Sequence, residues 1–522
     1  MSAHAATTTD EEWVEVPHRG FITLSVMLAT IMQALDTTIA NVALPHMQGE
    51  LSATQDQISW VLTSYIIAAA VMTAPSGVLA AKIGRRKLFL IAVIGFTVTS
   101  VLCGIATNLP EMVVFRLFQG VFGASLVPLS QAVLLDINPP KRHASAMAVW
   151  GVGVMLGPIL GPTLGGWITE NFHWRWVFFI NLPIGVLATF GIAAFMKETV
   201  IDKLRRFDFF GFAMLSLFLC SMQLALDRGE SKDWFSSPEI IGESVLAGTA
   251  LYLFLVHILT SERPFIDPAM FRDRNYTFSL MFMFVMGIIL LATMALLPPF
   301  LENLMGYPVV TTGLILAPRG VGTAVSMMIA GKVVGKFDVR FLLAFGLSCM
   351  AFSLWQMSQF NLDVSQAMLV ETGLLQGFGM GFVFVPLTAV AYATLPKHYR
   401  NDAAGVFSLV RNIGSSVGIS IMIAVLARNI QINHMELGER VNLFNLPKAM
   451  LQVLPGMPVN AYSPMAMAVL DSEVNRQAAA ISYLNDFKAL MFVVLSVMVI
   501  LPFLKVVKRA NAKPVSAGEI LE

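Results

Sequence analysis

Charged residues are scarce in this chain of 522 residues, where Asp, Glu, Lys and Arg together make 13%. A soluble domain carries about 25% charged and about 45–50% apolar residues, whereas 56% of this chain is hydrophobic. This composition excludes an ordinary soluble protein. Because one membrane-spanning helix needs about 20 apolar residues, the sequence predicts an all-α polytopic membrane protein.

Cysteine is also rare, and neither positive nor negative charge is in clear excess. The three cysteines lie far apart and form no C-x-x-C pair, which excludes a disulfide framework and a zinc site of that kind. The net charge of +1 leaves no global field to attract nucleic acid. The sequence has no phosphate-binding G-x-x-x-x-G-K-[ST] loop and no H-E-x-x-H motif. We therefore expect no catalytic residues, no metal and no cofactor, and do not expect an enzyme.

Long apolar windows predict the membrane spans. Their continuity favours helices over barrel strands, which alternate in hydrophobicity over about 10 residues. The N-terminal 18 residues are polar and lack the features of a signal peptide. The fourteen predicted spans are 20–44, 58–81, 88–107, 111–135, 144–168, 175–196, 208–226, 240–260, 276–301, 310–334, 340–360, 367–393, 403–428 and 487–506.

Lys and Arg fall in alternate loops, which predicts the orientation, because short basic loops stay in the cytoplasm. Both termini are accordingly predicted to be cytoplasmic, and the segment 429–486 is predicted to face outside. That segment either contacts a partner or caps an outer vestibule. The basic segments are 82–87, 136–143, 197–207, 261–275, 332–340, 397–402 and the tail after 505.

The first half of the chain recurs in the second at an almost constant offset. The matching pairs, 256 to 258 residues apart, are Gln119 with Gln376, Val127-Pro128 with Val385-Pro386, Pro140 with Pro396, and Gly157 with Gly414. Parallel repeats of this kind are typical of transporters whose site lies between two halves. The predicted organisation is a cytoplasmic segment 1–19, a six-helix bundle 20–196, a linker with two inserted spans 197–260, a second six-helix bundle 261–506 with the long loop 429–486, and a cytoplasmic tail 507–522.

Five motifs resemble one known family. They are residues 35–45 (LDTTIANVALP), 77–87 (GVLAAKIGRRK), 116–120 (R-x-x-Q-G), 157–166 (GPILGPTLGG) and 226–240. Together they resemble the major facilitator superfamily, specifically the fourteen-span drug:proton antiporters of the EmrB/QacA type, closest to the EmrB branch. The resemblance implies the major facilitator fold, hydrophobic small-molecule substrates, protons as the coupling ion, and a Gram-negative inner membrane. It also implies two partners, a periplasmic adaptor and a TolC-type outer-membrane channel.

Asp36 is the most informative single residue, because an acid inside a span costs at least about 2.5–3.5 kcal/mol and persists only beside a cavity or a partner. A carboxyl that neutralises in low dielectric suits a proton carrier. The alternative is a static ion pair with Arg116, which itself either takes part in coupling or only ties two spans together. The other candidates for coupling or substrate contact are Gln33, Asn41, Gln119, Arg319 and Arg411. Glu371 lies near a span end, so simple exposure is the favoured interpretation for it.

Two further motifs suggest moving contacts. The loop signature with Gly77, Gly84 and Arg85 resembles a cytoplasmic latch, with Asp136 as the expected partner of Arg85, although Ala81 stands where the family has an acid. The glycines of 157–166 form a smooth strip for close helix packing, and they either gate the transporter or only pack tightly. This antiporter motif consists of Gly157, Pro158, Gly161, Pro162, Gly165 and Gly166.

The sequence thus predicts proton-driven export of hydrophobic or amphipathic compounds by rocking of two bundles. A narrower exporter of one metabolite, such as a siderophore or fatty acid, is an alternative within the same class. Alternatives of other classes are a non-transporting receptor or scaffold on this fold and an integral-membrane enzyme.

Overall fold

The computed structural model describes residues 16–139, 142–199, 201, 207–262, 264–396, 399–440 and 464–504. Across these residues the chain is helical, with one isolated bridge between Val334 and Phe337 and no strand. Thirteen of the described helices are long and apolar enough to cross a membrane, or fourteen when the bent pair α3 and α4 is counted as one span. The prediction of an all-α polytopic membrane protein is confirmed.

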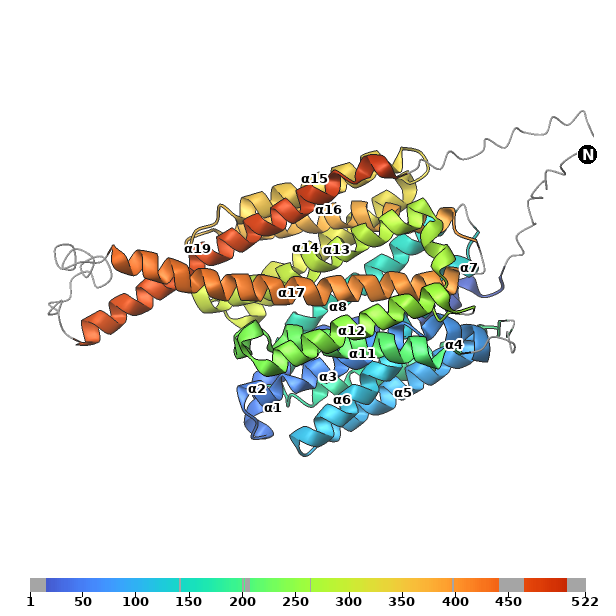
Figure 1. Ribbon diagram of the computed structural model, residues 1–522, viewed down its shortest axis with the longest axis horizontal. Coiled ribbons are helices and arrows are strands. Elements are labelled where there is room, and N and C mark those ends of the chain that lie inside the picture. The colour runs from blue at the N-terminus through green and yellow to red at the C-terminus, as the bar shows by residue number, and fades with distance from the viewer. Residues whose placement is uncertain are drawn as a thin grey trace, which may run out of the picture. The chain divides into compact units, whose positions relative to one another are not determined.

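The chain divides after residue 206 into two compact units. The helices of the first unit, drawn from blue to green in Figure 1, are α1 (Arg19–Glu50), α2 (Gln55–Ile58), α3 (Trp60–Thr73), α4 (Ser76–Ile83), α5 (Arg85–Ile105), α6 (Leu109–Gly123), α7 (Leu126–Asp136), α8 (His143–Asn171), α9 (Trp176–Phe179) and α10 (Asn181–Phe195).

Breaks between helices of this unit follow local sequence signals. Pro75 precedes α4, which is inclined by 56° to α3, because a proline removes a helix hydrogen bond and disfavours helical geometry in the residue before it. Gly84 separates α4 from α5 with a φ of +94°, a conformation that favours glycine. Asn108 begins α6 by accepting a hydrogen bond from the backbone of Glu111.

The second unit contains the remaining helices. They are α11 (Phe209–Arg228), η2 (Glu230–Lys232), η3 (Trp234–Ser236), α12 (Pro238–Thr260), η4 (Pro268–Arg272), α13 (Arg274–Pro299), the π-helix η5 (Phe300–Leu304), α14 (Val309–Val333), α15 (Val339–Met357), α16 (Gln366–Ala393), α17 (Arg400–Glu439), α19 (Pro464–Met498) and η7 (Leu501–Phe503).

The two inserted spans, α11 and α12, belong to the second compact unit and do not stand apart between two bundles. They pack on each other, and α11 also packs on α17. The Ser416 hydroxyl of α17 donates a 2.5 Å hydrogen bond to Gln223 Oε1 of α11. The predicted boundary at residue 261 is therefore not a boundary between compact units.

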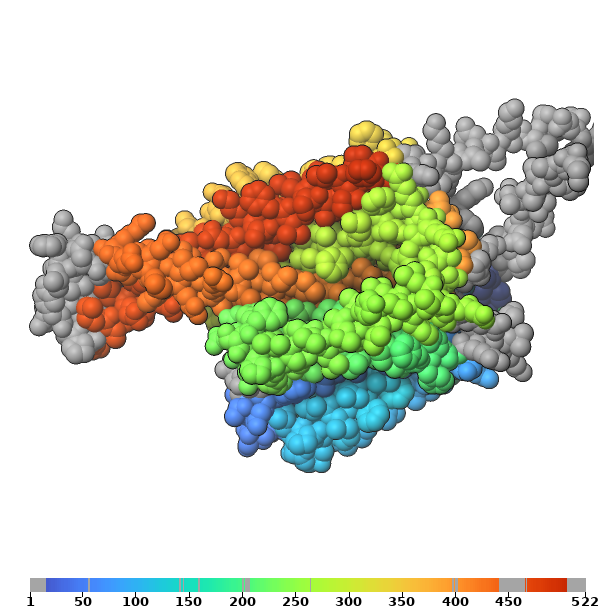
Figure 2. Space-filling view, viewed as in Figure 1, coloured from blue at the N-terminus to red at the C-terminus, as the bar shows by residue number. Residues whose placement is uncertain are grey.

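The segment 429–486, predicted as a long loop, is largely helical where it is described. Helix α17 continues to Glu439, so the span predicted at 403–428 is part of a longer helix. Helix α19 runs from Pro464 to Met498, so it begins well before the span predicted at 487–506 and ends inside it. Both helices run side by side and extend past the other helices of their unit (Figures 1 and 2). A hydropathy window ends where side chains become polar, even though the backbone stays helical. The stretch 441–463, the terminal segments 1–15 and 505–522, and most of the linker 200–206 lie outside the described residues.

Helix pairing repeats between the two units, as the sequence repeat predicts. In the first unit α1 packs on α8 and α10, α3 on α6, and α5 on both α6 and α10. In the second unit α13 packs on α17 and α19, α14 on α16, and α15 on both α16 and α19. The order of elements then matches α1 with α13, α6 with α16, and α10 with α19.

Candidate coupling and substrate site

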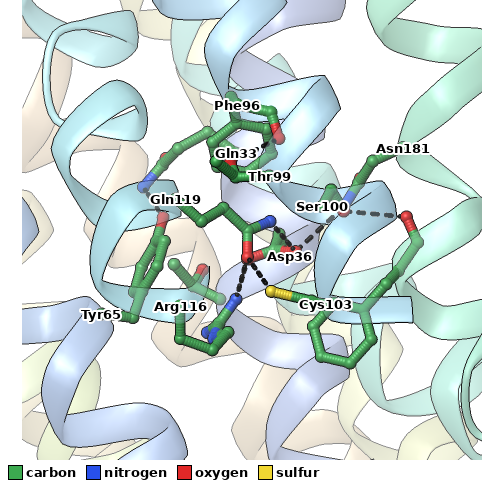
Figure 3. Close-up of polar contacts among 12 residues, drawn as sticks. Gln33, Asp36, Tyr65, Phe96, Thr99, Ser100, Cys103, Arg116, Gln119 and Asn181 are labelled. Carbon is green, nitrogen blue, oxygen red and sulfur yellow. Dashed lines mark hydrogen bonds and ion pairs between the residues drawn. The ribbon is translucent and has the colours of Figure 1, made fainter. Parts of the chain in front are cut away.

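An ion pair lies buried inside the first unit. Arg116 Nη1 of α6 lies 2.7 Å from Asp36 Oδ2 of α1, and both side chains are fully buried (Figure 3). The structure therefore brings together the two charged residues that the sequence singled out in this half. Removing one partner of such a pair typically costs about 3–5 kcal/mol, because the other charge is left uncompensated.

Side-chain amides complete the surroundings of the Asp36 carboxylate. Gln119 Nε2 and Asn181 Nδ2 each donate a 2.9 Å hydrogen bond to Asp36 Oδ1. Asn181 Nδ2 also donates to Ser100 Oγ at 2.9 Å, and that hydroxyl donates to the carbonyl of Phe178 at 2.8 Å. Donors from α6 and α10 thus stabilise the negative charge on α1, and helix α5 supports them through Ser100.

Arg116 is held by several groups but retains one unused donor. Its Nε donates to the Val61 carbonyl at 3.2 Å and its Nη1 to Gln119 Oε1 at 2.8 Å. The guanidinium lies 4.2 Å from the centre of the Tyr65 ring, a favourable cation–π arrangement. Its Nη2 is buried without a hydrogen-bond partner among the described residues. The arginine can therefore bind an additional acceptor.

Gln33 reaches this cluster through Tyr65. Gln33 Nε2 donates a 3.2 Å hydrogen bond to the Tyr65 hydroxyl, while the face of the same ring covers Arg116. Asn41, the third polar candidate on α1, is exposed and takes no part in the cluster.

The glycine strip of α8 packs directly on the helix that carries Asp36. A Cβ atom added to Gly157 would overlap the Ala34 backbone, and one added to Gly161 would overlap the Thr38 side chain. The Thr38 hydroxyl donates a 3.0 Å hydrogen bond to the Gly157 carbonyl. Close approach of α1 and α8 therefore requires glycine here.

The remaining residues of this motif lie along the same helix. Gly165 faces Ile39 of α1, Gly166 is buried and Pro162 is half-buried. The side chain of Pro158 lies outside the described residues. The close packing predicted for the strip is thus present at Gly157, Gly161 and Gly165.

At the end of the same unit, Arg85 forms an ion pair with Asp136, which joins the first residue of α5 to the last residue of α7. Gly77 is buried in α4. A carboxylate that the sequence did not indicate, Glu198, accepts hydrogen bonds from the backbone of Arg86 at 3.1 Å and of Lys87 at 3.2 Å. An acid at this place stabilises the exposed amide groups at the start of α5.

The candidates of the second unit are not assembled into a comparable cluster. Arg319 is buried in α14, and its Nη2 has no hydrogen-bond partner within the described part of the chain. Arg411 is half-buried on α17, and Glu371 is exposed on α16. The exposure predicted for Glu371 is confirmed.

Several polar residues of interest were missed from sequence. Asn181, Ser100 and Tyr65 lie in apolar runs and carry no charge, so only the contacts in three dimensions reveal them. Asp486 is a buried acid of α19, but the hydropathy window for that span began one residue later. A test for isolated acids at the margins of apolar windows would have found it.

A helical fold of two repeated units with a buried ion pair in a membrane span is typical of membrane transporters. The model of the Major Facilitator Superfamily matches residues 26–419, and the chain belongs to this superfamily. The assignment to the fourteen-span EmrB/QacA type, within the EmrB branch, is likewise confirmed.

Individual relatives agree with this assignment. The chain is 36% identical over 440 residues to the multidrug export protein EmrB of Escherichia coli, covering 84% of this chain and 86% of that protein. It is 36% identical over 431 residues to the fatty acid resistance protein FarB of Neisseria gonorrhoeae, covering 81% and 84%.

Solved structures confirm the fold. The proton:xylose symporter XylE superposes with a TM-score of 0.60 at 13% identity, covering 94% of this chain and 97% of that one. The human organic anion transporter MFSD10 superposes with a TM-score of 0.58 at 15% identity, covering 92% and 100%.

Proposed function

We propose that this protein exports hydrophobic or amphipathic drugs across the inner membrane in exchange for protons. The observation that carries the proposal is the fully buried Asp36–Arg116 pair, set in a chain that belongs to the EmrB branch of drug exporters. A buried acid inside a membrane span is costly and marks a functional site by default.

The contacts of Asp36 support a mechanism in which a proton competes with Arg116 for the Asp36 carboxylate. A proton bound to Asp36 removes the negative charge that Arg116 and the amides of Gln119 and Asn181 stabilise. Arg116 then carries an uncompensated buried charge, which favours another arrangement of α1 and α6. Loss of the proton restores the pair. Protonation and conformation are thereby linked, as antiport requires.

Movement of α1 is proposed to reach the rest of the unit through the glycine strip. Because α8 contacts α1 at Gly157 and Gly161, a shift of the helix that bears Asp36 must displace or slide along α8. The Arg85–Asp136 pair at the end of the unit is proposed to hold the form closed to the cytoplasm.

The partners and orientation are proposed on the basis of the relatives. A periplasmic adaptor and a TolC-type outer channel are proposed as partners because the motifs resemble the EmrB type, and the 36% identity to the E. coli multidrug export protein EmrB supports that membership. The distribution of Lys and Arg supports cytoplasmic termini.

A second candidate substrate class also has support. Identity of 36% to the fatty acid resistance protein FarB makes export of amphipathic fatty acids an alternative to multidrug export. Both candidates use the same coupling chemistry at Asp36.

Transport by purified protein in liposomes tests the proposal. An imposed pH gradient should drive movement of a fluorescent hydrophobic cation, and an uncoupler should abolish it. Asp36→Asn, which keeps the side-chain shape but removes the titrating group, should lose this drive. Glu371→Gln, which changes an exposed acid, is the matched control and should transport normally. If the unaltered protein transports at the same rate with and without the pH gradient, proton coupling is contradicted.

A further inference from the structure

A second buried carboxyl group lies in the other unit, on α19. Asp486 is fully buried, and neither of its oxygens has a hydrogen-bond partner among the described residues. Asp36, by contrast, receives donors on both oxygens. An ionised carboxylate without donors is very costly in a low-dielectric interior, whereas the neutral acid is tolerated. The surroundings of Asp486 therefore favour a bound proton.

Aromatic groups form much of this environment. Phe300 of η5 lies with its ring centre 5.5 Å from that of Tyr483 and 6.3 Å from that of Phe487. Tyr483 precedes Asp486 by one turn of α19, and Phe487 is the next residue. Asp486 is fully buried beside these residues, and their rings carry no charge that would balance an ionised carboxylate.

Charged side chains on the neighbouring elements leave Asp486 unpaired. Helix α19 packs on α13, α15, α17 and η5. Arg274 and Arg340 lie at the starts of α13 and α15, Glu302 lies on η5, and Arg411 and Arg428 lie on α17. Arg428 is exposed, and so is Lys488, which lies on α19 itself. Among the described residues, none of these groups forms a hydrogen bond or ion pair with Asp486.

Polar side chains lie between Asp486 and the end at which α17 and α19 extend, although none of them forms a hydrogen bond with Asp486 in this conformation. Ser482 lies one turn before Asp486 and is fully buried, and it accepts a 2.9 Å hydrogen bond from Asn433 Nδ2 of α17. The next residue of α17, His434, lies 3.1 Å from Asp471 of α19, and both of these side chains are open to solvent. The Ser482 hydroxyl itself donates to the Ala478 carbonyl at 2.7 Å. A series of polar groups therefore begins one turn from the buried acid and continues to the end of the unit that is predicted to face outside.

The opposite direction along α19 is apolar. Its buried side chains after Asp486 are those of Phe487, Leu490, Val494 and Val497. No polar group on this face continues the series within α19. Along the described part of α19, buried polar side chains near Asp486 therefore lie only on the Ser482 side.

We propose that Asp486 is a second proton-binding carboxyl group of the transport cycle, loaded from the outer end through Asn433 and Ser482. This inference rests on the proposed proton-coupled function and adds a second site to it, in the unit that lacks an Asp36–Arg116 pair. The proton is the only species bound and released, so no other reactant is required.

Proton release on substrate binding tests this proposal. Purified protein in weakly buffered solution receives a fluorescent hydrophobic cation, and the protons released are counted. We expect Asp486→Asn to reduce the release by about half, because one of two proton-binding groups is lost, and Asp486→Glu to restore it. Unchanged release in Asp486→Asn would overturn the proposal while leaving Asp36 coupling intact. Absence of release in the unaltered protein would instead overturn the proposed function.

Infrared spectroscopy gives a second readout that does not depend on transport. The unaltered protein should show the carbonyl band of a buried protonated carboxylic acid, and that band should be missing in Asp486→Asn. Ser482→Ala keeps the acid and interrupts the polar connection, so it should retain the band and slow its loss after a jump to high external pH. Should Asp486→Asn not fold, either of two results would reject the proposal: no carboxylic acid band in the unaltered protein, or loss of that band in Ser482→Ala at the unaltered rate.

Discussion

The two units place different chemistry at matching positions. With the repeat offset of 257 residues, Asp36 corresponds to Thr293, Arg116 to Gly373 and Gln119 to Gln376. Gln119 Nε2 donates to Asp36 at 2.9 Å, and Gln376 Nε2 lies 3.4 Å from Thr293 Oγ1. The amide contact between two helices is therefore retained in the second unit, whereas the ion pair is absent from it.

The difference is one of charge, because the second unit has a hydroxyl at Thr293 and a glycine at Gly373 where the first has a carboxylate and a guanidinium. The second unit has its own buried cation beside the same position, since a Cβ on Gly373 would lie 3.8 Å from the Cβ of Arg319. That arginine comes from α14 and not from α16, and no acid pairs with it among the described residues. We infer that the paired charges provide coupling, and that the amide contact alone provides packing.

Removing the arginine of the pair should have the largest effect. Arg116→Ala leaves Asp36 buried without its cation, so we expect a loss of about 3–5 kcal/mol in the free energy of unfolding and loss of gradient-driven transport. Thermal unfolding in detergent and transport in liposomes measure these quantities. The double variant Asp36→Asn with Arg116→Gln should regain part of the stability but not the coupling. A stable, coupled Arg116→Ala protein would show that the pair has no special role.

The two matching glutamines provide a sharper comparison. Gln119→Ala removes hydrogen bonds to both charged groups, for which we expect about 1.5–3 kcal/mol, while Gln376→Ala removes one neutral contact, worth about 0.5–1.5 kcal/mol. Unfolding of the two variants side by side gives the difference. Equal losses would mean that the ion pair does not make its amide neighbour more important.

A larger side chain in the glycine strip 157–166 should affect turnover and substrate binding to different extents. Gly161→Leu forces α8 away from Thr38 of α1, and overpacking of this kind typically costs about 1–3 kcal/mol. We expect turnover to fall much more than substrate affinity, as measured by transport and by equilibrium binding. Gly242→Leu, at a glycine with open space around it, is the control. Normal turnover in Gly161→Leu would leave the strip with a packing role only.

The smallest effect is expected at the Arg85–Asp136 pair. The Asp136 side chain is 40% exposed and that of Arg85 is 11% exposed, so the pair is partly open to solvent. Surface pairs are worth about 0–1 kcal/mol, and Asp136→Arg should therefore shift the balance of conformations without unfolding the protein. Accessibility of a cysteine placed near this end should rise in the single variant, and Arg85→Asp with Asp136→Arg should reverse part of the change. If accessibility and transport stay the same, α5 is held at this end by Glu198 and apolar packing.

The spans and the pairing of Asp36 with Arg116 could be predicted because apolar runs and charges within them are strong local signals, and the repeat could be predicted from its matching motifs. Apolar runs mark the membrane, and a lone acid such as Asp36 within one is conspicuous. Asn181 was missed because a neutral amide in an apolar run has many possible roles, and its contact with Asp36 spans 145 residues. The extension of α17 to Glu439 was missed because hydropathy detects the membrane and not the helix.

The central claim is tested most directly by measuring two activities of Asp36→Asn: exchange of drug across the membrane without a pH gradient, and drug transport driven by a gradient. Liposomes with the drug on both sides and no pH gradient report exchange, which requires the conformational change but no net proton movement. The account predicts that Asp36→Asn still exchanges drug across the membrane but no longer concentrates it when a pH gradient is imposed. Accumulation driven by the gradient in Asp36→Asn, at the rate of the unaltered protein, would contradict it.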